Sequence, residues 1–161
     1  MTLRLSPLGA IFWIGAVLVF LAPRAHAQTA TDNFQVSVTI LDSCSIVADD
    51  LDFGGQTVLD SVVDDSTLVT VNCSVGTAYA VSLDAGVNGT RLMSDGSETV
   101  AYELYTSALR TLEWGINVGV DTLGGIGTGI DQVLTAYGRV LVQATPGPAT
   151  YTDTITATIA F

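Results

Sequence analysis

The sequence predicts an all-β sandwich that follows an N-terminal export signal. Past residue 27, apolar residues recur at every second position and show no helical period, and Gly, Asp, Asn, Ser and Thr separate the runs. Short alternating runs bounded by turn residues are typical of half-buried strands. The 134 residues that follow position 27 suit one domain with a single hydrophobic core.

The first 27 residues have the pattern of a secretory signal peptide. Arg4 precedes an uncharged, mainly apolar run over 5–22, and Ala25-His26-Ala27 supplies small residues at the two positions that a signal peptidase reads. An uncleaved membrane anchor is the alternative, because the run approaches the roughly 20 residues that span a bilayer. The Ala-x-Ala pattern favours cleavage after Ala27, since an anchor has no use for it.

The charge of the remaining chain is strongly negative. Cleavage would remove Arg4 and Arg24, leaving three arginines and no lysine against sixteen acidic residues, a net charge of −13. Such a surface repels phosphate backbones, so nucleic-acid binding is excluded as a function. Plentiful and regularly spaced apolar residues also argue against a disordered chain.

Two cysteines, Cys44 and Cys73, lie in the exported part. In an exported protein, a pair of cysteines indicates one disulfide and not a metal site. The bond would close a loop of about 30 residues and stabilise the fold by ~3.5 kcal/mol on the chain-entropy estimate. Two buried free thiols are the alternative interpretation.

Alternation predicts the positions of the strands. The last run is the clearest, because Tyr151, Ile155, Ala157, Ile159 and Phe161 share one parity against threonines. It reaches the final residue, so we expect no later strand to close the sheet. The run over 133–143 contains Gly138 and breaks parity, which predicts a bulge or a bend. The expected strands are 34–40, 68–73, 79–84, 100–104, 112–116, 133–143 and 151–161.

Turn residues separate these runs. Asn88-Gly89 and Asp95-Gly96 are pairs that accept positive φ and favour tight reversals. We expect a flexible loop over the glycine-rich stretch 124–129 and a turn at Pro146-Gly147-Pro148. The glycine stretch resembles a dinucleotide-binding fingerprint only superficially, because no strand-plus-helix pattern surrounds it.

The residues of an enzyme or a zinc site are missing from the exported part. His26 is the single histidine and falls in the signal, and lysine is absent, so neither a Ser-His-Asp arrangement nor a Schiff base is available. We therefore expect no catalytic residue, no metal site and no cofactor. Two acidic clusters leave calcium open, although solvated turn carboxylates are the favoured interpretation; they are Asp49, Asp50 and Asp52, and Asp64 and Asp65.

Two tyrosines could mark a sugar-binding face. Tyr105 and Tyr137 are aromatic residues that are expected to be exposed. Packing between neighbouring strands is the commoner role of such aromatic residues, and we favour it here.

Several short motifs resemble a known family when they are taken in order. Residues 33–161 are similar to the spore coat protein U-like domain, which is found in subunits of archaic chaperone–usher pili. The family usually has Gly just before the Tyr-x-Asp of its last strand, where this chain has Ala149-Thr150. The motifs are the alternating segment before Cys44, then 51–54, 71–74, 79–86, 91–93, 101–105, 114–115, 137–140 and 151–155.

The resemblance implies an immunoglobulin-like sandwich that lacks its last strand. A groove beside the C-terminal strand would be filled first by a periplasmic chaperone and then, at an outer-membrane usher, by the N-terminal strand of the next subunit. We thus expect a signal peptide over 1–27, a donor segment over 28–41 and a sandwich over 42–161. The expected donor residues are Phe34, Val36, Val38 and Ile40, and the expected groove-edge residues are Ile155, Ala157, Ile159 and Phe161.

The functional expectation is a pilus subunit that is exported through the periplasm to the cell surface, with a role in adhesion or biofilm. An ordinary first strand packed within its own domain is the alternative for residues 33–41. Two other functions also remain: a self-complemented secreted coat or matrix protein, and a tip adhesin that binds a receptor. An adhesin would be expected to carry an additional binding domain.

Overall fold

The computed structural model describes residues 26–161. The predicted signal sequence up to Ala25 lies outside this range, so the structure does not test its cleavage. The chain divides into two units, Met1–Val38 and Thr39–Phe161. Residues 26–43 contain neither helix nor strand and are exposed. Within the described residues, no helix is long and apolar enough to span a membrane.

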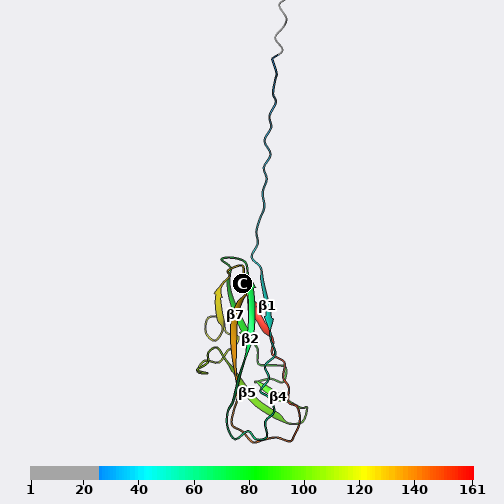
Figure 1. Cartoon of the computed structure of the whole chain (residues 1–161), viewed down its shortest axis with the longest axis vertical. Coiled ribbons are helices and arrows are strands. Elements are labelled where there is room, and N and C mark those ends of the chain that lie inside the picture. Colours follow the sequence, from blue (N-terminus) through cyan, green and yellow to red (C-terminus); the bar gives the residue numbers. More distant parts are fainter. Residues whose placement is uncertain (1–25) are drawn as a thin grey trace, which may run out of the picture. The chain divides into compact units, whose positions relative to one another are not determined.

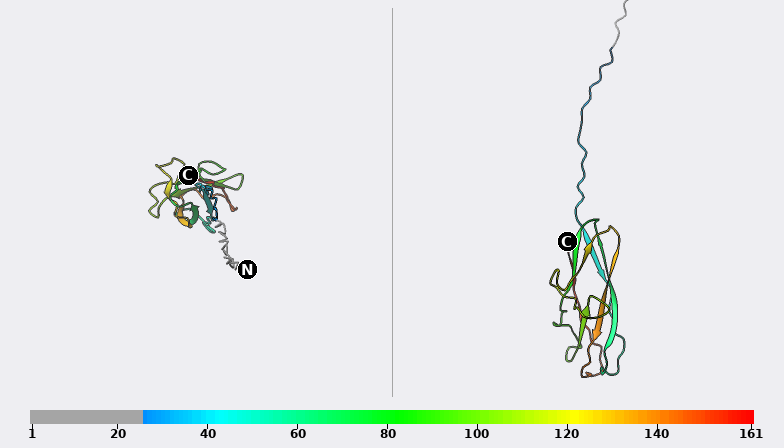
Figure 2. Two further views of the ribbon diagram at one scale, coloured as in Figure 1. Left: turned by 90° about the horizontal axis from the view of Figure 1, so that it is seen from above. Right: turned by 90° about the vertical axis from the view of Figure 1, so that its left-hand side faces the viewer.

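The second unit is built from antiparallel strands in two sheets (Figures 1 and 2). The five-stranded sheet has the order β1-β2-β7-β5-β4, and the three-stranded sheet has the order β6-β3-β8. This arrangement confirms the all-β sandwich that the alternation predicts. The strands are β1 (Cys44–Ala48), β2 (Val63–Cys73), β3 (Ala78–Leu83), β4 (Leu92–Ser94), β5 (Thr99–Tyr105), β6 (Leu123–Ile126), β7 (Gln132–Val140) and β8 (Ala157–Ala160).

Apolar residues from both sheets form one buried core. Val71, Cys73 and Val81 are fully buried, and Trp114 fills the core from the loop that follows β5. The remaining buried apolar residues are Leu59, Val69, Tyr79, Leu83, Val100, Tyr102, Leu104, Ala136 and Val140. Most of them have the inward parity expected from the sequence, because alternate side chains of a strand point to opposite faces of the sheet.

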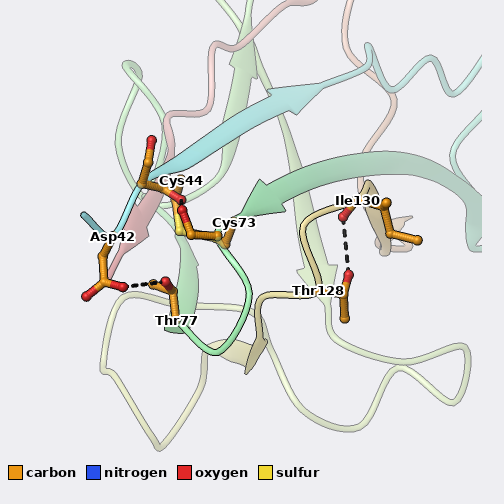
Figure 3. Close-up of a disulfide and its surroundings, with 8 residues drawn as sticks. Asp42, Cys44, Cys73, Thr77, Thr128 and Ile130 are labelled. Carbon is orange, nitrogen blue, oxygen red and sulfur yellow. Dashed lines mark hydrogen bonds between the residues drawn. A yellow bond between two sulfur atoms is a disulfide. The ribbon is translucent and has the colours of Figure 1, made fainter. Parts of the chain in front are cut away.

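The disulfide joins Cys44 at the start of β1 to Cys73 at the end of β2 (Figure 3). The two residues also face each other in the β1–β2 ladder. The pairing predicted from the cysteine count is therefore present. The bond lies at the point where the N-terminal segment joins the sandwich, so it anchors that junction to the five-stranded sheet.

The predicted strand over 112–116 is wrong. The segment forms a single isolated β-bridge, between Glu113 and Tyr105, and the side chain of Trp114 is buried in the core. Trp114 donates its indole N–H to the carbonyl of Val81 at 2.8 Å, and its own carbonyl accepts from the buried guanidinium of Arg91. These contacts tie the loop to the three-stranded sheet, where an alternating pattern alone suggested another strand.

The glycine-rich stretch is not wholly a loop. Leu123–Ile126 forms β6 and pairs with β3. A Cβ atom added at Gly124 would lie 2.8 Å from the Tyr79 carbonyl oxygen, and one added at Gly125 would lie 2.7 Å from the Tyr79 hydroxyl. Glycine therefore lets β6 approach β3 closely. The expectation of a flexible loop over 124–129 is wrong for residues 124–126, which belong to β6.

Gly138 causes neither a bulge nor a bend. β7 keeps one register with β2 from Val63↔Val140 to Val71↔Gln132. Leu134, Ala136 and Val140 share the inward parity of Gly138, so the parity is continuous. A Cβ atom at Gly138 would lie 2.5 Å from Leu51 Cδ2, which means that glycine makes room for core side chains.

The last strand is shorter than its alternating pattern. Only Ala157–Ala160 is paired as a strand, with β3. Ahead of it, Thr152 bridges Ser94, and Asp84 holds the amide of Thr156. The inward parity still persists through Ile155, Ala157 and Ile159, which are half-buried, whereas Phe161 is 61 % exposed.

Candidate strand-binding groove

Two strand edges lie near each other without pairing. Within the described residues, β1 pairs only with β2, and β8 pairs only with β3. Some Cα atoms of β1 and β8 nevertheless come within 8 Å of one another, although the two strands belong to different sheets. Each strand therefore presents backbone N–H and C=O groups on its outer side, and such an edge is a template for an added strand.

A groove of about 1210 Å³ opens on this side of the sandwich. Its sides are the segments 48–57 and 145–157. Its floor consists of buried core residues from both sheets, namely Val69, Leu83, Val100, Tyr102, Leu104, Ala136 and Val140. The volume exceeds the roughly 300–1,000 Å³ of a typical small-molecule pocket. The groove therefore lies directly over the hydrophobic core, whose side chains on the groove floor are at most 6 % exposed.

The first side of the groove is fixed by backbone contacts. The hydroxyl of Thr67 on β2 donates to the carbonyls of Asp49 at 3.0 Å and Asp50 at 2.9 Å. The Asp52 carboxylate accepts the amide of Gly54 at 2.8 Å. The ring of Phe53 lies 6.4 Å from that of Tyr102, in a tilted arrangement. This segment therefore presents half-buried apolar side chains to the groove although its backbone forms no strand.

The second side is held by two carboxylates. Asp84 accepts the amides of Thr156 at 2.9 Å and Gly86 at 3.0 Å. Burial opposes ionisation of this group, but these hydrogen bonds outweigh it and lower the pKa of Asp84. Asp153 accepts the hydroxyl of Tyr102 at 2.8 Å. Both carboxylates tie residues 153–156 to the body of the sandwich.

The contact between Tyr102 and Asp153 crosses the groove floor. Burial, followed by the neighbouring Asp153 carboxylate, raises the pKa of Tyr102, so the phenol stays protonated and donates. Gly86 has a φ of +84°, and a Cβ atom there would collide with the Asp153 carboxylate. A glycine at this position thus allows the close approach that seats Asp153.

The predicted donor residues are accessible. Phe34, Val36, Val38 and Ile40 are 82–89 % exposed. No strand includes them in the described residues. Four large apolar side chains of one parity are thereby left in water, and an exposed apolar row of this kind indicates a surface that binds a partner.

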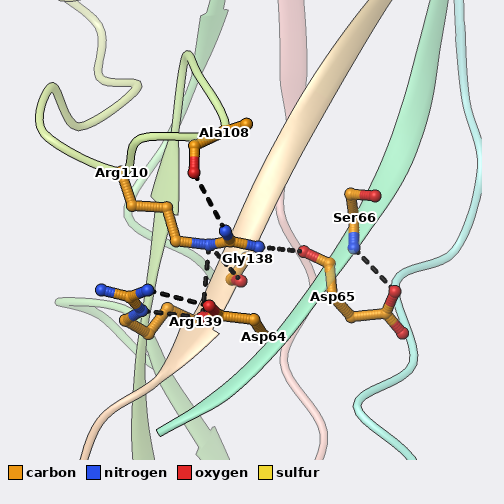
Figure 4. Close-up of polar contacts among 7 residues, drawn as sticks. All are labelled: Asp64, Asp65, Ser66, Ala108, Arg110, Gly138 and Arg139. Atoms are coloured by element: carbon orange, nitrogen blue, oxygen red, sulfur yellow. Dashed lines mark hydrogen bonds and ion pairs between the residues drawn. The ribbon is translucent and has the colours of Figure 1, made fainter.

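The acidic cluster at Asp64 forms ion pairs (Figure 4). Arg139 binds the Asp64 carboxylate through two hydrogen bonds of 2.7 and 2.8 Å, and Arg110 lies 3.3 Å away. The Arg139 hydrogen bond, opposed by burial and aided by both positive charges, lowers the pKa of Asp64. Among residues 26–161 no group of three or more acidic, histidine or cysteine side chains could hold a metal ion.

Tyr105 and Tyr137 face each other across the β5–β7 ladder. The guanidinium of Arg110 lies 5.7 Å from the centre of the Tyr137 ring. The two tyrosines are therefore cross-strand neighbours on the outer face of the five-stranded sheet. This is the packing role that the sequence favoured for them.

Sequence reasoning did not assign a role to Asp84, Tyr102 or Asp153. Each lies inside a motif that carried the family resemblance, at 79–86, 101–105 and 151–155. Alternation places Tyr102 on the inward face but does not show which polar group its hydroxyl meets. The hydrogen bond joins residues 51 positions apart, so only the fold brings the pair together.

Comparison with known proteins supports the resemblance. The chain is 27 % identical to a chain in the crystal structure of the CsuC–CsuE chaperone–tip adhesion subunit pre-assembly complex from archaic chaperone–usher Csu pili of Acinetobacter baumannii, with a TM-score of 0.55. The match covers 76 % of this chain and 40 % of that one. No curated protein matches. The family model of the Spore Coat Protein U domain matches residues 30–158, so the chain belongs to this family.

Proposed function

We propose that this protein is a structural subunit of a chaperone–usher pilus and that it polymerises by donor-strand exchange. In this reaction, the segment 28–41 of one copy enters the groove between the segments 48–57 and 145–157 of the next. The observation that carries the proposal is the groove, since it lies over buried core residues between the segments 48–57 and 145–157, beside two strand edges that have no partner in the described residues. The family match and the solved neighbour favour this structural role over catalysis.

The donor segment has the chemistry that the groove requires. Burial of Phe34, Val36, Val38 and Ile40 would contribute roughly 1.5–3 kcal/mol for each side chain. Main-chain hydrogen bonds to the backbone that lines the groove would add to this. The ordering of the donor backbone opposes these gains. Side chains at alternate positions thus give the specificity of the joint, and the backbone provides additional affinity.

The contact would generate a fibre. The donor segment and the groove are different surfaces of the same chain, so the interface is heterologous, and each added copy offers a new donor or groove. No nucleotide is needed, because strand exchange itself supplies the free energy. Before assembly, the exposed apolar donor row and the groove need protection, and a periplasmic chaperone is the expected first occupant of the groove. The solved neighbour is named as a chaperone–subunit complex.

Replacement of donor side chains by aspartate tests the proposal. Val36→Asp with Val38→Asp places two charges at inward positions of the donor, and we expect it to abolish surface fibres while chaperone-bound monomer accumulates. Gln35→Asp with Ser37→Asp is the matched control, with the same added charge at the opposite parity. Electron microscopy of cells that co-express the chaperone and the usher is the measurement. Normal fibres from the Val36/Val38 variant would refute donor-strand exchange.

A self-complemented coat or matrix protein is the competing function. In that case residues 33–41 would fill the groove of their own chain, and the chain purified without a chaperone would be a stable monomer. A tip adhesin is a further candidate, because the solved neighbour is named for a tip adhesion subunit. Fibres composed mainly of this chain would indicate a shaft subunit, whereas a single copy at the end of each fibre would indicate an adhesin.

A further inference from the structure

A second pocket, of about 350 Å³, lies beside the segment that follows β5, and we call it the Arg91 pocket. Its lining residues come from four segments, 83–85, 90–91, 103–104 and 113–121. Of these residues, Leu83 and Leu104 also line the strand-binding groove, and the others do not. The volume is near the lower end of the roughly 300–1,000 Å³ that small-molecule pockets occupy. The pocket therefore suits a ligand of about one sugar ring.

Arg91, just before β4, brings a buried positive charge to this pocket. The residue is only 8 % exposed. Its Nη2 atom donates to the carbonyls of Leu83 at 3.1 Å and Trp114 at 2.8 Å. Its Nη1 atom is buried as well, but it has no hydrogen-bond partner among the described residues. A buried donor without a partner is unfavourable, and more so when it belongs to a charged group. The pocket therefore favours an occupant with an oxygen that can accept from this guanidinium.

Two carboxylates that line the pocket are available as acceptors. Within residues 26–161, the side chains of Glu103 and Glu113 take part in no hydrogen bond. Glu103 is half-buried and Glu113 is exposed. Burial and the neighbouring Glu113 charge raise the pKa of Glu103, and the Arg91 charge partly opposes them. A ligand that donates hydrogen bonds to both carboxylates would stabilise their charged forms.

The charges of the pocket disfavour ions of either sign. Asp84 and Asp121 also line it, so four carboxylates accompany one guanidinium, and an anion would be repelled. A metal cation would be repelled by Arg91 and would find these two aspartates already engaged. Asp84 accepts the Thr156 amide at 2.9 Å. Asp121 accepts the Asn117 amide at 2.6 Å. We therefore expect a neutral ligand whose groups both donate and accept hydrogen bonds.

Hydroxyl groups meet these requirements. One hydroxyl can donate to a carboxylate and accept from a guanidinium at the same time. Hydrogen bonds in which one partner is ionised are also the stronger ones. Ile116 lines the pocket as well and is 63 % exposed, so it offers an apolar surface to C–H groups. A sugar ring carries hydroxyls around its edge and C–H groups on its faces, and it fits this combination of polar and apolar contacts.

We infer that the Arg91 pocket binds one neutral pyranose ring of a carbohydrate. Glu103 and Glu113 accept hydrogen bonds from its hydroxyls, and the Arg91 guanidinium donates to an oxygen of the same ring. The site lies within the body of a single copy, so the inference does not depend on strand exchange. A fibre of such subunits would repeat a weak sugar site along its length, and multivalent attachment would raise its avidity.

Saturation-transfer difference NMR tests this site. The sample is the exported chain with its chaperone, or the chain alone if it is a stable monomer, and the chaperone alone is the blank. The probes are mannose, galactose and glucose, each as the free sugar and as the methyl glycoside. Glu103→Gln and Glu113→Gln each remove one acceptor charge. Asp60→Asn is the matched control, because Asp60 is exposed and lines neither the pocket nor the groove.

We expect magnetisation transfer to at least one sugar, with binding about tenfold weaker in each glutamate variant and unchanged in the control. Transfer to methyl glycosides alone indicates the end of a glycan as the ligand, and transfer to free sugars as well indicates a single sugar; both support the inference. The absence of transfer to every probe would overturn it, as would equal affinities of Glu113→Gln and Asp60→Asn. Because Glu113 is exposed, this variant keeps the test valid if the half-buried Glu103→Gln fails to fold. Fibre assembly is not measured here, so the sugar site and the proposed function can fail independently.

Discussion

The substitution Gly138→Ala probes the coupling between the core and the groove. An added Cβ atom would lie 2.5 Å from Leu51 Cδ2 and 2.8 Å from Phe53 Cζ. Contacts this short force neighbouring side chains to move, and overpacking of a core typically costs about 1–3 kcal/mol. Leu51 and Phe53 line the groove. Any movement away from β7 therefore brings them into the space of an inserted strand, and we expect strand binding to weaken as well as folding.

A chain with residues 32–41 appended after Phe161 through a flexible linker offers a convenient assay, because under the proposed function the groove would then be filled from within. Guanidinium unfolding of this chain should show a loss of about 1–3 kcal/mol for Gly138→Ala. Ser61→Ala is the control, because Ser61 is exposed and does not line the groove. The control should change the unfolding free energy by less than about 0.5 kcal/mol. Equal midpoints for the two variants would refute the packing argument.

Three further predictions use the same chain. Tyr102→Phe removes the hydrogen bond to the Asp153 carboxylate and should lower the unfolding free energy by about 1.5–3 kcal/mol. Tyr79→Phe is the control, because Tyr79 is also buried but makes no such bond, and it should change the unfolding free energy by less than about 0.5 kcal/mol. Equal losses for the two variants would count against the Asp153 contact. The pKa of Asp84 is lowered in the folded chain, so its stabilising effect is complete above the unfolded value of 3.8 and is lost as the pH falls through the lower folded pKa. The stability difference between Asp84→Asn and the unsubstituted chain should hence be constant from pH 7 to pH 5 and shrink below about pH 4; a difference that is constant down to pH 2 would contradict it. Replacement of both Cys44 and Cys73 by serine should lower the unfolding free energy by ~3.5 kcal/mol, and an unchanged guanidinium midpoint would argue against the loop-closure account.

Strand positions with clear alternation were predictable from the sequence. β3 and β5 lie within a residue or two of the expected runs 79–84 and 100–104. Each contains side chains of one parity that enter the core, which is the pattern that a two-residue repeat encodes. The turn at Asp95-Gly96 was also predictable, because the Asp95 carboxylate accepts the amides of Ser97 and Glu98 and Gly96 adopts a φ of +98°.

The sequence predictions were wrong at glycines that are required by tertiary packing and not by local backbone conformation. Gly124 and Gly125 were assigned to a flexible loop, and Gly138 to a bulge or bend. All three lie in regular strands, where a Cβ atom would meet Tyr79, Leu51 or Phe53. Local rules treat glycine as a source of backbone freedom. The sequence alone does not show that the space beside a glycine is occupied by residues distant in the chain.

The sequence led to the expectation of a groove beside the last strand, but it did not show which segments form the sides of the groove. The family resemblance implied a groove along the last strand. Of the expected groove-edge residues, Ile155 and Ala157 line the groove that the structure contains, whereas Ile159 and Phe161 do not. The contribution of 48–57 as the opposite side could not be inferred, because this segment has no alternation. Its position depends on hydrogen bonds from Thr67 to the carbonyls of Asp49 and Asp50, and backbone acceptors of this kind leave no signature in the sequence.

Folding and the proposed strand binding would depend on the same side chains. Val69, Val100 and Val140 belong to the core and also form the groove floor. A substitution on the floor therefore lowers the stability of the body and the affinity for the inserted strand together, and loss of fibres would not distinguish the two effects. The donor side chains are different, because Val36 and Val38 are more than four-fifths exposed in the described chain. Changes there leave the body intact, so a loss of fibres from donor variants reports on strand insertion itself.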